Sequence, residues 1–272
     1  MTLMRNVVKR ALGGGRSGPR RPAPAVPGNT LFMPGNQWYR PAIAGASTFG
    51  ASMLAGTATV RRALTVLERL TPDAYADYVM AFYRAGLERH PHTWQFADIN
   101  TALLAVAAGL QPASYLEIGV RRGRSLAMVA SVCPACDVLA CDMFLEGYAG
   151  MDNPGAELVA SELARVGYSG RLEFLLGDSH IVLPDHFRAN PDRFFDLITV
   201  DGDHSKAGAR ADLETVMPRL KVGGALVFDD LSNPSHPELS DVWRDVVARQ
   251  RSYSTFTFTE TGFGVGVAIR HD

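Results

Sequence analysis

Residues 114–125 read Ser-Tyr-Leu-Glu-Ile-Gly-Val-Arg-Arg-Gly-Arg-Ser, and this stretch decides the fold of the chain. Tyr115, Leu116 and Ile118 form a short apolar run, which is typical of a strand buried on both faces. Gly119 ends the strand, and apolar residues at helical spacing indicate that a helix opens near residues 124–125. The free N–H groups and the positive end of such a helix favour a ligand carboxylate or phosphate.

The spacing of the glycines narrows the choice of ligand. The loop has G-x-x-x-G, whereas a dinucleotide fingerprint has G-x-G-x-x-G and a P-loop ends in Gly-Lys-Ser/Thr. Glu117 suits an ammonium group, and the helix start suits a carboxylate, so an amino-acid-like ligand satisfies both. The pattern Glu117-x-Gly119-x-x-x-Gly123-x-Ser125 resembles the first motif of class I S-adenosylmethionine (SAM) methyltransferases. The resemblance implies that these residues bind the methionine end of SAM; the alternative is an ordinary glycine-turned connection of a parallel sheet.

The composition limits the possible partners. The 272 residues are 47% hydrophobic, which is enough for one substantial core. Residues 1–67 hold nine Lys and Arg and no Asp or Glu, so the remainder, with 18 basic and 28 acidic residues, carries a net charge of −10. An acidic body argues against nucleic acid as a partner. The sequence contains no run of about 18 strongly apolar residues, so we predict no membrane span.

The cysteines indicate the compartment. Cys133, Cys136 and Cys141 cannot form a disulfide framework, so we expect a reducing, cytoplasmic location. The first two form a C-x-x-C pair, but this pair follows a helix instead of opening one, and no second pair completes a zinc site. Packing is therefore their predicted role.

The N-terminal part divides into two segments. Residues 1–40 are basic and rich in Gly and Pro, and we predict a disordered tail. Residues 41–94 are predicted to be a helical extension that forms an acceptor wall or lid, with helices at 60–70 and 72–88. Pro72 is expected at the first position of the second helix and Thr71 as its N-cap. The aromatic residues on one face of this helix are expected to pack on the sheet or, alternatively, to line a substrate pocket.

Strands and helices alternate through the rest of the chain. This pattern, followed by a hairpin, predicts a doubly wound, mostly parallel α/β sheet with one antiparallel strand over residues 95–272. It resembles the seven-stranded, Rossmann-like class I methyltransferase domain that binds SAM. The predicted strands are 114–119, 137–142, 171–176, 195–201, 224–229, 254–260 and 264–270, and the predicted helices are 98–108, 124–132, 155–166, 179–189, 206–217 and 241–250.

Polar residues end the second and third strands, and ligands of open parallel sheets bind at such ends. Asp142 can accept hydrogen bonds from both ribose hydroxyls of a nucleoside. The family resemblance places adenine beside Asp178 and Ser179, with Ser179 alternatively serving only as the N-cap of the following helix.

Three carboxylates follow the fourth and fifth strands. Asp201, Asp229 and Asp230 are expected to crowd together, which requires a cation, and oxygen ligands suit Mg²⁺, with Ca²⁺ or Mn²⁺ as alternatives. The motifs resemble those of metal-dependent small-molecule O-methyltransferases of the catechol and macrolide-sugar types, which implies that these three residues bind the metal. Where the catechol type has a catalytic lysine, this chain has His204, which is predicted to be the base or else to orient its neighbours.

The sequence therefore predicts a SAM-dependent O-methyltransferase, assisted by a divalent metal, with His204 and Asp201 as catalytic residues. The acceptor is expected to be a hydroxyl of a small molecule, either a sugar of a natural product or a phenol. The alternatives are a non-catalytic SAM-binding module and an oxidoreductase or hydroxylase-like enzyme on a similar sheet. The helical extension could also serve as a homo-oligomer surface. Packing or solvent exposure is predicted for His90, His92, His180, His186 and His236, and at least two of Arg121, Arg122 and Arg124 are predicted to be solvated.

Overall fold

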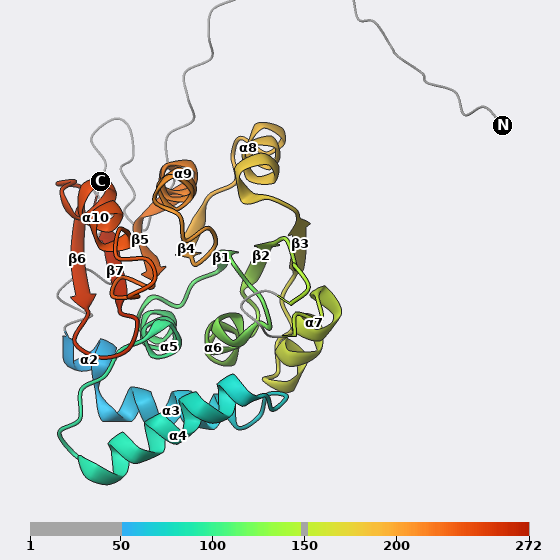
Figure 1. Ribbon diagram of the computed structural model, residues 1–272. Helices are drawn as coiled ribbons and strands as arrows, with labels where there is room; N and C mark the ends of the chain where they lie inside the picture. Colours follow the sequence, from blue (N-terminus) through green and yellow to red (C-terminus); the bar gives the residue numbers. More distant parts are fainter. Residues whose placement is uncertain (1–50, 148–151, 272) are drawn as a thin grey trace, which may run out of the picture.

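The computed structural model describes residues 51–147 and 152–271 (Figure 1). The predicted tail at 1–40 and the first residues of the helical extension lie outside this range. A seven-stranded sheet forms the centre of the molecule, in the order β3-β2-β1-β4-β5-β7-β6. The strands are β1 (Ser114–Ile118), β2 (Asp137–Asp142), β3 (Leu172–Leu176), β4 (Phe195–Val200), β5 (Leu220–Asp229), β6 (Tyr253–Phe258) and β7 (Val265–Arg270).

The sheet confirms the predicted fold class. Strands β1 to β5 pair in parallel, and β7 lies antiparallel between β5 and β6. All six residues of β4 are buried, as are the last four of β1, which explains their apolar sequences. The chain leaves β1 for β2 on one side and later returns to β4 on the other. The order of the strands therefore reverses beside β1, where such sheets bind ligands.

Helices cover both faces of the sheet (Figure 1). On one face lie α5 and α6, with α3 and α4 packed outside them; on the other lie α8, α9 and α10. Each face has its own apolar core, built around residues such as Leu103 and Met128 on one side and Leu213 and Trp243 on the other. The helices are α2 (Ala51–Ala55), α3 (Thr57–Leu67), α4 (Ala74–Arg89), α5 (Ile99–Leu110), α6 (Arg124–Val132), α7 (Ala156–Arg165), α8 (Ser179–Ala189), α9 (Lys206–Val216), the 3₁₀ turn η2 (Met217–Arg219), α10 (Leu239–Trp243) and the π-helical turn η3 (Arg244–Ala248).

Helix α4 begins two residues later than predicted. Its N-cap is Asp73, whose carboxylate accepts hydrogen bonds from the N–H groups of Tyr75 and Ala76 at 3.0 and 2.9 Å. Thr71 instead donates its N–H and hydroxyl to the buried carboxylate of Glu162 in α7, at 2.7 and 2.5 Å. The predicted cap was wrong because a distant acidic side chain binds the Thr71 hydroxyl.

Two further boundaries differ from the sequence prediction. Strand β5 begins at Leu220, four residues before the predicted start, with an irregularity in its pairing to β4 between Phe195 and Leu197. The predicted helix at 241–250 begins at Leu239 as α10 and continues into η3. The early start of β5 follows from the pairing of Leu220 with Phe195 of β4.

All three cysteines are free and buried. Burial raises the pKa of the Cys136 and Cys141 thiols to about 12 and also raises that of Cys133, so none is a ready thiolate. Within residues 51–147 and 152–271, no helix combines the length and the apolar character needed to cross a membrane.

Candidate functional site

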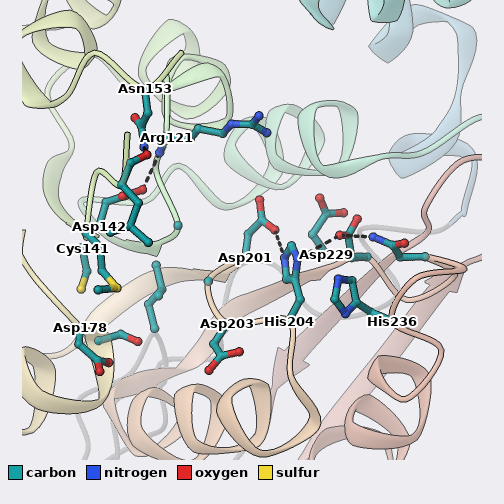
Figure 2. Close-up of a pocket in the computed structure, with 18 of the residues that line it drawn as sticks. Arg121, Cys141, Asp142, Asn153, Asp178, Asp201, Asp203, His204, Asp229 and His236 are labelled. Atoms are coloured by element: carbon teal, nitrogen blue, oxygen red, sulfur yellow. Dashed lines mark hydrogen bonds and ion pairs between the residues drawn. The ribbon is translucent and has the colours of Figure 1, made fainter. Parts of the chain in front are cut away.

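A cavity of about 600 Å³ lies at the carboxyl ends of the parallel strands (Figure 2). Residues that end or follow β1, β2, β3, β4 and β5 line it, together with residues from α4 and from the turn between β6 and β7. The cavity thus lies at the reversal of strand order beside β1.

Gly119 marks the closest approach of two strands. Its φ is +82°, and a Cβ atom there would lie 1.8 Å from the carbonyl oxygen of Asp201. The Asp201 N–H donates to the Ile118 carbonyl at 2.9 Å, and the Gly119 N–H donates to the Cys141 carbonyl at 3.0 Å. Only glycine leaves room for the backbones of β1 and β4 to meet at this edge of the cavity.

Beneath this turn, the carboxyl of Glu117 is fully buried. It accepts hydrogen bonds from the Tyr115 hydroxyl and, at 2.7 Å, from the Ser125 hydroxyl. Burial raises the pKa of Glu117 to about 8 although both hydrogen bonds oppose the shift. Glu117 and Ser125 do not line the cavity; neither does Gly123, the N-cap of α6 with φ +75°. These three predicted cofactor residues support the turn from below.

Asp142 connects the end of β2 to the glycine turn and lines the cavity. Its Oδ2 accepts hydrogen bonds from the N–H groups of Val120 and Arg121, both at 2.7 Å, and its Oδ1 accepts from the Phe144 N–H at 2.5 Å. Figure 2 shows this carboxylate beside Arg121, on the opposite side of the cavity from His236. Oδ2 thus has both lone pairs occupied, and Oδ1 keeps one lone pair for a ligand hydroxyl.

The end of β3 supplies a second polar group. Asp178 is the N-cap of α8 and accepts from the His180 N–H at 2.9 Å. Ser179 donates its hydroxyl to Asp212 at 2.6 Å, and His180 Nε2 lies 3.3 Å from the same carboxylate. Asp178, Ser179 and His180 all line the cavity. The prediction that His180 has only a packing or surface role missed its position at the cavity.

The predicted acidic cluster is assembled around an imidazole. His204 Nε2 lies 3.2 Å from Asp201 Oδ1, and His204 Nδ1 lies 3.6 Å from Asp230 Oδ2. One ligand atom from each of these three residues lies within 4.8 Å of the other two. Asn233 Nδ2 donates to Asp230 Oδ2 at 2.8 Å, and Asp229 lines the same cavity (Figure 2).

The charges in this cluster depend on one another. Burial raises the pKa of Asp201 and of Asp229, and neighbouring carboxylates raise both further. Burial lowers the pKa of His204, but its hydrogen bond to Asp201 and the charges of Asp201 and Asp230 outweigh burial, so the net shift is upward. The cluster therefore favours a positive charge at its centre. The two or three carboxylates fit a divalent cation with the imidazole beside it, so the residues present suit the predicted metal.

His236 was missed by the sequence analysis as a site residue. It lines the cavity, and its ring centroid lies 5.2 Å from that of His204. His236 is isolated in the sequence and belongs to no motif, so nothing indicated a role for it. The loop after β5 brings it to the cavity.

The turn between β6 and β7 closes this end of the cavity with Phe263, whose exposed fraction is 50%. The Ser232 N–H donates to the Phe263 carbonyl at 2.5 Å, and the Leu231 N–H donates to the Gly264 carbonyl at 3.3 Å. The turn is thus fastened to the backbone that directly follows Asp230. Gly262 in this turn lies against Phe96, which precedes α5, since a Cβ atom on Gly262 would be 3.8 Å from the Phe96 ring.

Of the three arginines in the glycine turn, at least two were predicted to be solvated, but Arg122 and Arg124 are largely buried ion-pair partners. Arg122 Nε lies 3.0 Å from Asp73 Oδ2, and Arg124 pairs with the same oxygen. Their side chains are 11% and 12% exposed. The prediction was wrong because Asp73 lies far away in sequence and reaches the glycine turn only through the fold.

Residues 116–231 match the model of a methyltransferase domain. No curated protein matches the chain. Among solved structures, the O-methyltransferase TomG from Streptomyces achromogenes, involved in tomaymycin synthesis and in complex with SAM, is 20% identical, with 75% of this chain and 92% of that chain covered and a TM-score of 0.51. An O-methyltransferase from Bacillus cereus in complex with SAH is 17% identical, with 78% and 90% covered and a TM-score of 0.51.

A third similar structure is the SAH-bound methyltransferase PaMTH1 from Podospora anserina. It is 14% identical, with 79% of this chain and 88% of that chain covered and a TM-score of 0.50. At these identities the likeness shows a shared fold.

Proposed function

Because this chain carries a methyltransferase domain within a class I methyltransferase fold, we propose that it is an enzyme that transfers a methyl group from SAM to a hydroxyl of a small molecule. The main observation behind the proposal is that one cavity contains both a set of residues suited to a nucleoside and a set suited to a metal and an acceptor. Asp142 and Asp178 stand on the β2 and β3 side, and the Asp201–His204–Asp230 cluster stands on the β4 and β5 side.

In this proposal the β2 and β3 side binds the nucleoside. Asp142 accepts a ribose hydroxyl with the remaining lone pair of Oδ1, and Asp178 and Ser179 lie along the adenine. The methionine end lies beside Gly119, which lines the cavity, and Glu117, Gly123 and Ser125 hold the turn in shape. SAM, when bound, supplies the electrophilic methyl group.

The β4 and β5 side binds the acceptor. Asp201, Asp229 and Asp230 would hold a divalent cation, with Mg²⁺ as our first choice. When bound, such a cation lowers the pKa of a nearby hydroxyl. His204 receives the proton that the hydroxyl loses as its oxygen bonds to the methyl carbon and the carbon–sulfur bond breaks. The resemblance to catechol-type and sugar-type enzymes supports a phenol or a sugar of a natural product as the acceptor.

The three buried thiols support a reducing compartment such as the cytoplasm. The proposed partner is therefore a small molecule inside the cell. Assembly into a homo-oligomer through the helical layer stays a prediction.

Titration calorimetry tests the cofactor. We expect the wild-type protein to bind SAM and SAH, and Asp142→Ala to weaken both by about tenfold or more, because a charged acceptor of a ribose hydroxyl is lost. Absence of SAM binding by the wild-type protein would overturn the proposal.

Methyl transfer tests the metal and the base. With methyl-labelled SAM and a panel of phenols and nucleotide-linked sugars, EDTA should abolish product formation and Mg²⁺ should restore it. His204→Ala should lower turnover by about a hundredfold and leave SAM affinity unchanged. Full activity in EDTA rules out the metal role, and unchanged turnover in the variant rules out the base role.

A further inference from the structure

The first turn of α4 lies against the glycine turn although the two are far apart in sequence. Asp73 caps α4 through the N–H groups of Tyr75 and Ala76 and also pairs with Arg122 and Arg124. With exposed fractions of 11% and 12%, these arginine side chains are largely shielded from water. The start of α4 is thus held in place by both hydrogen bonds and charge.

This anchor places Tyr75 in the wall of the cavity. The Arg124 guanidinium lies 5.1 Å from the centre of the Tyr75 ring and so fixes the ring from one side. The Tyr75 hydroxyl makes no hydrogen bond to any residue in the described part of the chain. Burial, followed by the charges of Asp229 and Asp98, raises the pKa of Tyr75, so the hydroxyl stays protonated.

The position of Tyr75 indicates which part of the cofactor it can reach. Arg124, whose guanidinium lies over the Tyr75 ring, is the first residue of α6 and directly follows Gly123, so Tyr75 lies beside the glycine turn that is proposed to receive the methionine end. The nucleoside groups proposed above lie on the other side of β1, at the ends of β2 and β3. A ligand that runs across the cavity from Asp142 past Gly119 therefore meets Tyr75 with its amino-acid end.

We propose that the Tyr75 hydroxyl hydrogen-bonds to the amino-acid end of SAM, so that the N-terminal helical layer completes the cofactor pocket. This inference rests on the proposed function, since it takes SAM as the cofactor. A neutral hydroxyl can accept from the ammonium group or donate to the carboxylate of the ligand. Tyr75 lies outside residues 116–231, so the matched domain alone lacks this contact.

Two ligands separate a contact with the amino-acid end from a general effect on the pocket. SAH contains the amino-acid end, whereas 5′-methylthioadenosine has the same adenosine and sulfur without it. Tyr75→Phe removes only the hydroxyl and keeps the ring beside Arg124. Tyr78→Phe is the matched control, because Tyr78 lies one turn along the same helix and is 67% exposed.

Titration calorimetry on the full-length protein measures the affinity of each variant for both ligands, and thermal unfolding confirms that each variant is folded. We expect Tyr75→Phe to bind SAH about tenfold more weakly, and to bind methylthioadenosine as the wild type does, because one hydrogen bond to a charged group is lost. Tyr78→Phe should bind both ligands as the wild type does. Equal weakening of both ligands in Tyr75→Phe, or unchanged SAH binding, overturns the role of Tyr75 alone. Failure of the wild type to bind SAH overturns this inference together with the proposed function.

Discussion

Glu117 shows how the surroundings of one residue change its expected chemistry. From the sequence it is a charged group that attracts an ammonium ion. In the structure it is fully buried, and its raised pKa of about 8 keeps it mostly protonated at neutral pH. Tyr115 lies two positions earlier on the same strand face, and its hydroxyl also contacts Thr199 at 2.8 Å, which is the β4 partner of Glu117. A single sequence does not reveal that cross-strand register.

Glu117→Gln tests this state. The folded pKa lies above the ordinary value of 4.5, so the neutral carboxyl stabilises the fold fully below that value, and the stability is lost as the pH rises through about 8. The wild-type unfolding free energy should therefore fall by a few kcal/mol, relative to the variant, between about pH 5 and about pH 8.5. Urea denaturation of both proteins across this range measures the difference. Parallel curves would show that Glu117 does not titrate in the fold.

The sequence predicted the three aspartates of the acidic cluster, but it did not predict the two histidines that also line the cavity. Asp201, Asp229 and Asp230 follow strands, and the ends of parallel strands meet at one edge, so the sequence alone brings them to one cavity. His180 and His236 also line this cavity. His236 lies in an irregular loop, and His180 faces the site because Asp212 of α9 holds its ring. Such positions depend on tertiary packing rather than on any spacing in the sequence.

The connection between β1 and β4 depends on one glycine. At Gly119 a side chain would need φ +82° and would collide with the Asp201 carbonyl. Gly119→Ala should lower the unfolding free energy by about 3 kcal/mol or more, since backbone strain and overpacking add. Gly147→Ala is the matched control, because Gly147 has φ +68° and no atom of residues 51–147 and 152–271 within 4 Å of the added Cβ, so we expect a loss of about 1 kcal/mol. Urea denaturation compares the two; equal losses would contradict the close approach of the strands.

The attachment of α4 to the glycine turn can be tested in the same way. Burial raises the pKa of Asp73, but the Ala76 N–H and the paired arginines outweigh burial and lower it below 3.8. Asp73→Asn keeps the cap and loses the ion pairs, so we expect a loss of about 2 kcal/mol at neutral pH. Asp73→Ala should cost about 1 kcal/mol more, through the lost cap.

The pH dependence of Asp73→Asn has a definite sign. A lowered folded pKa gives stability that is present above the ordinary value of 3.8 and is lost as the pH falls through the folded pKa. The difference in unfolding free energy between wild type and variant should therefore shrink below about pH 4. A difference that stays constant down to acid unfolding would exclude the charge of Asp73 as its cause.

The helices and strands could be predicted well where the apolar periodicity was strong. Their boundaries could be predicted less well where a residue distant in sequence sets them. The alternating strands and helices from β1 to α9 lie near their predicted positions because their apolar patterns repeat. The start of α4 moved because Glu162 binds Thr71, and β5 begins four residues early, where Leu220 pairs with Phe195 of β4. Both corrections come from contacts between remote segments.

The molecule as a whole concentrates acidic groups at one edge of its sheet. Asp142, Asp178, Asp201, Asp229 and Asp230 line a single cavity. SAM carries one net positive charge and SAH carries none, so the field of this edge should favour SAM. Raising NaCl from about 50 mM to about 500 mM should weaken SAM binding several-fold and SAH binding less, because salt screens charge. Calorimetry at both concentrations measures this, and equal salt dependence would contradict a net attraction by the cavity.

The fastening of the β6–β7 turn has a consequence for redesign. The carbonyls of Phe263 and Gly264 hold the backbone that immediately follows Asp230, so reshaping this turn would also displace a carboxylate of the proposed metal site. The side chain of Phe263 takes no part in those bonds. If the cavity binds the acceptor as proposed, changing the size of that ring alone is expected to alter which compounds fit while Asp230 keeps its place.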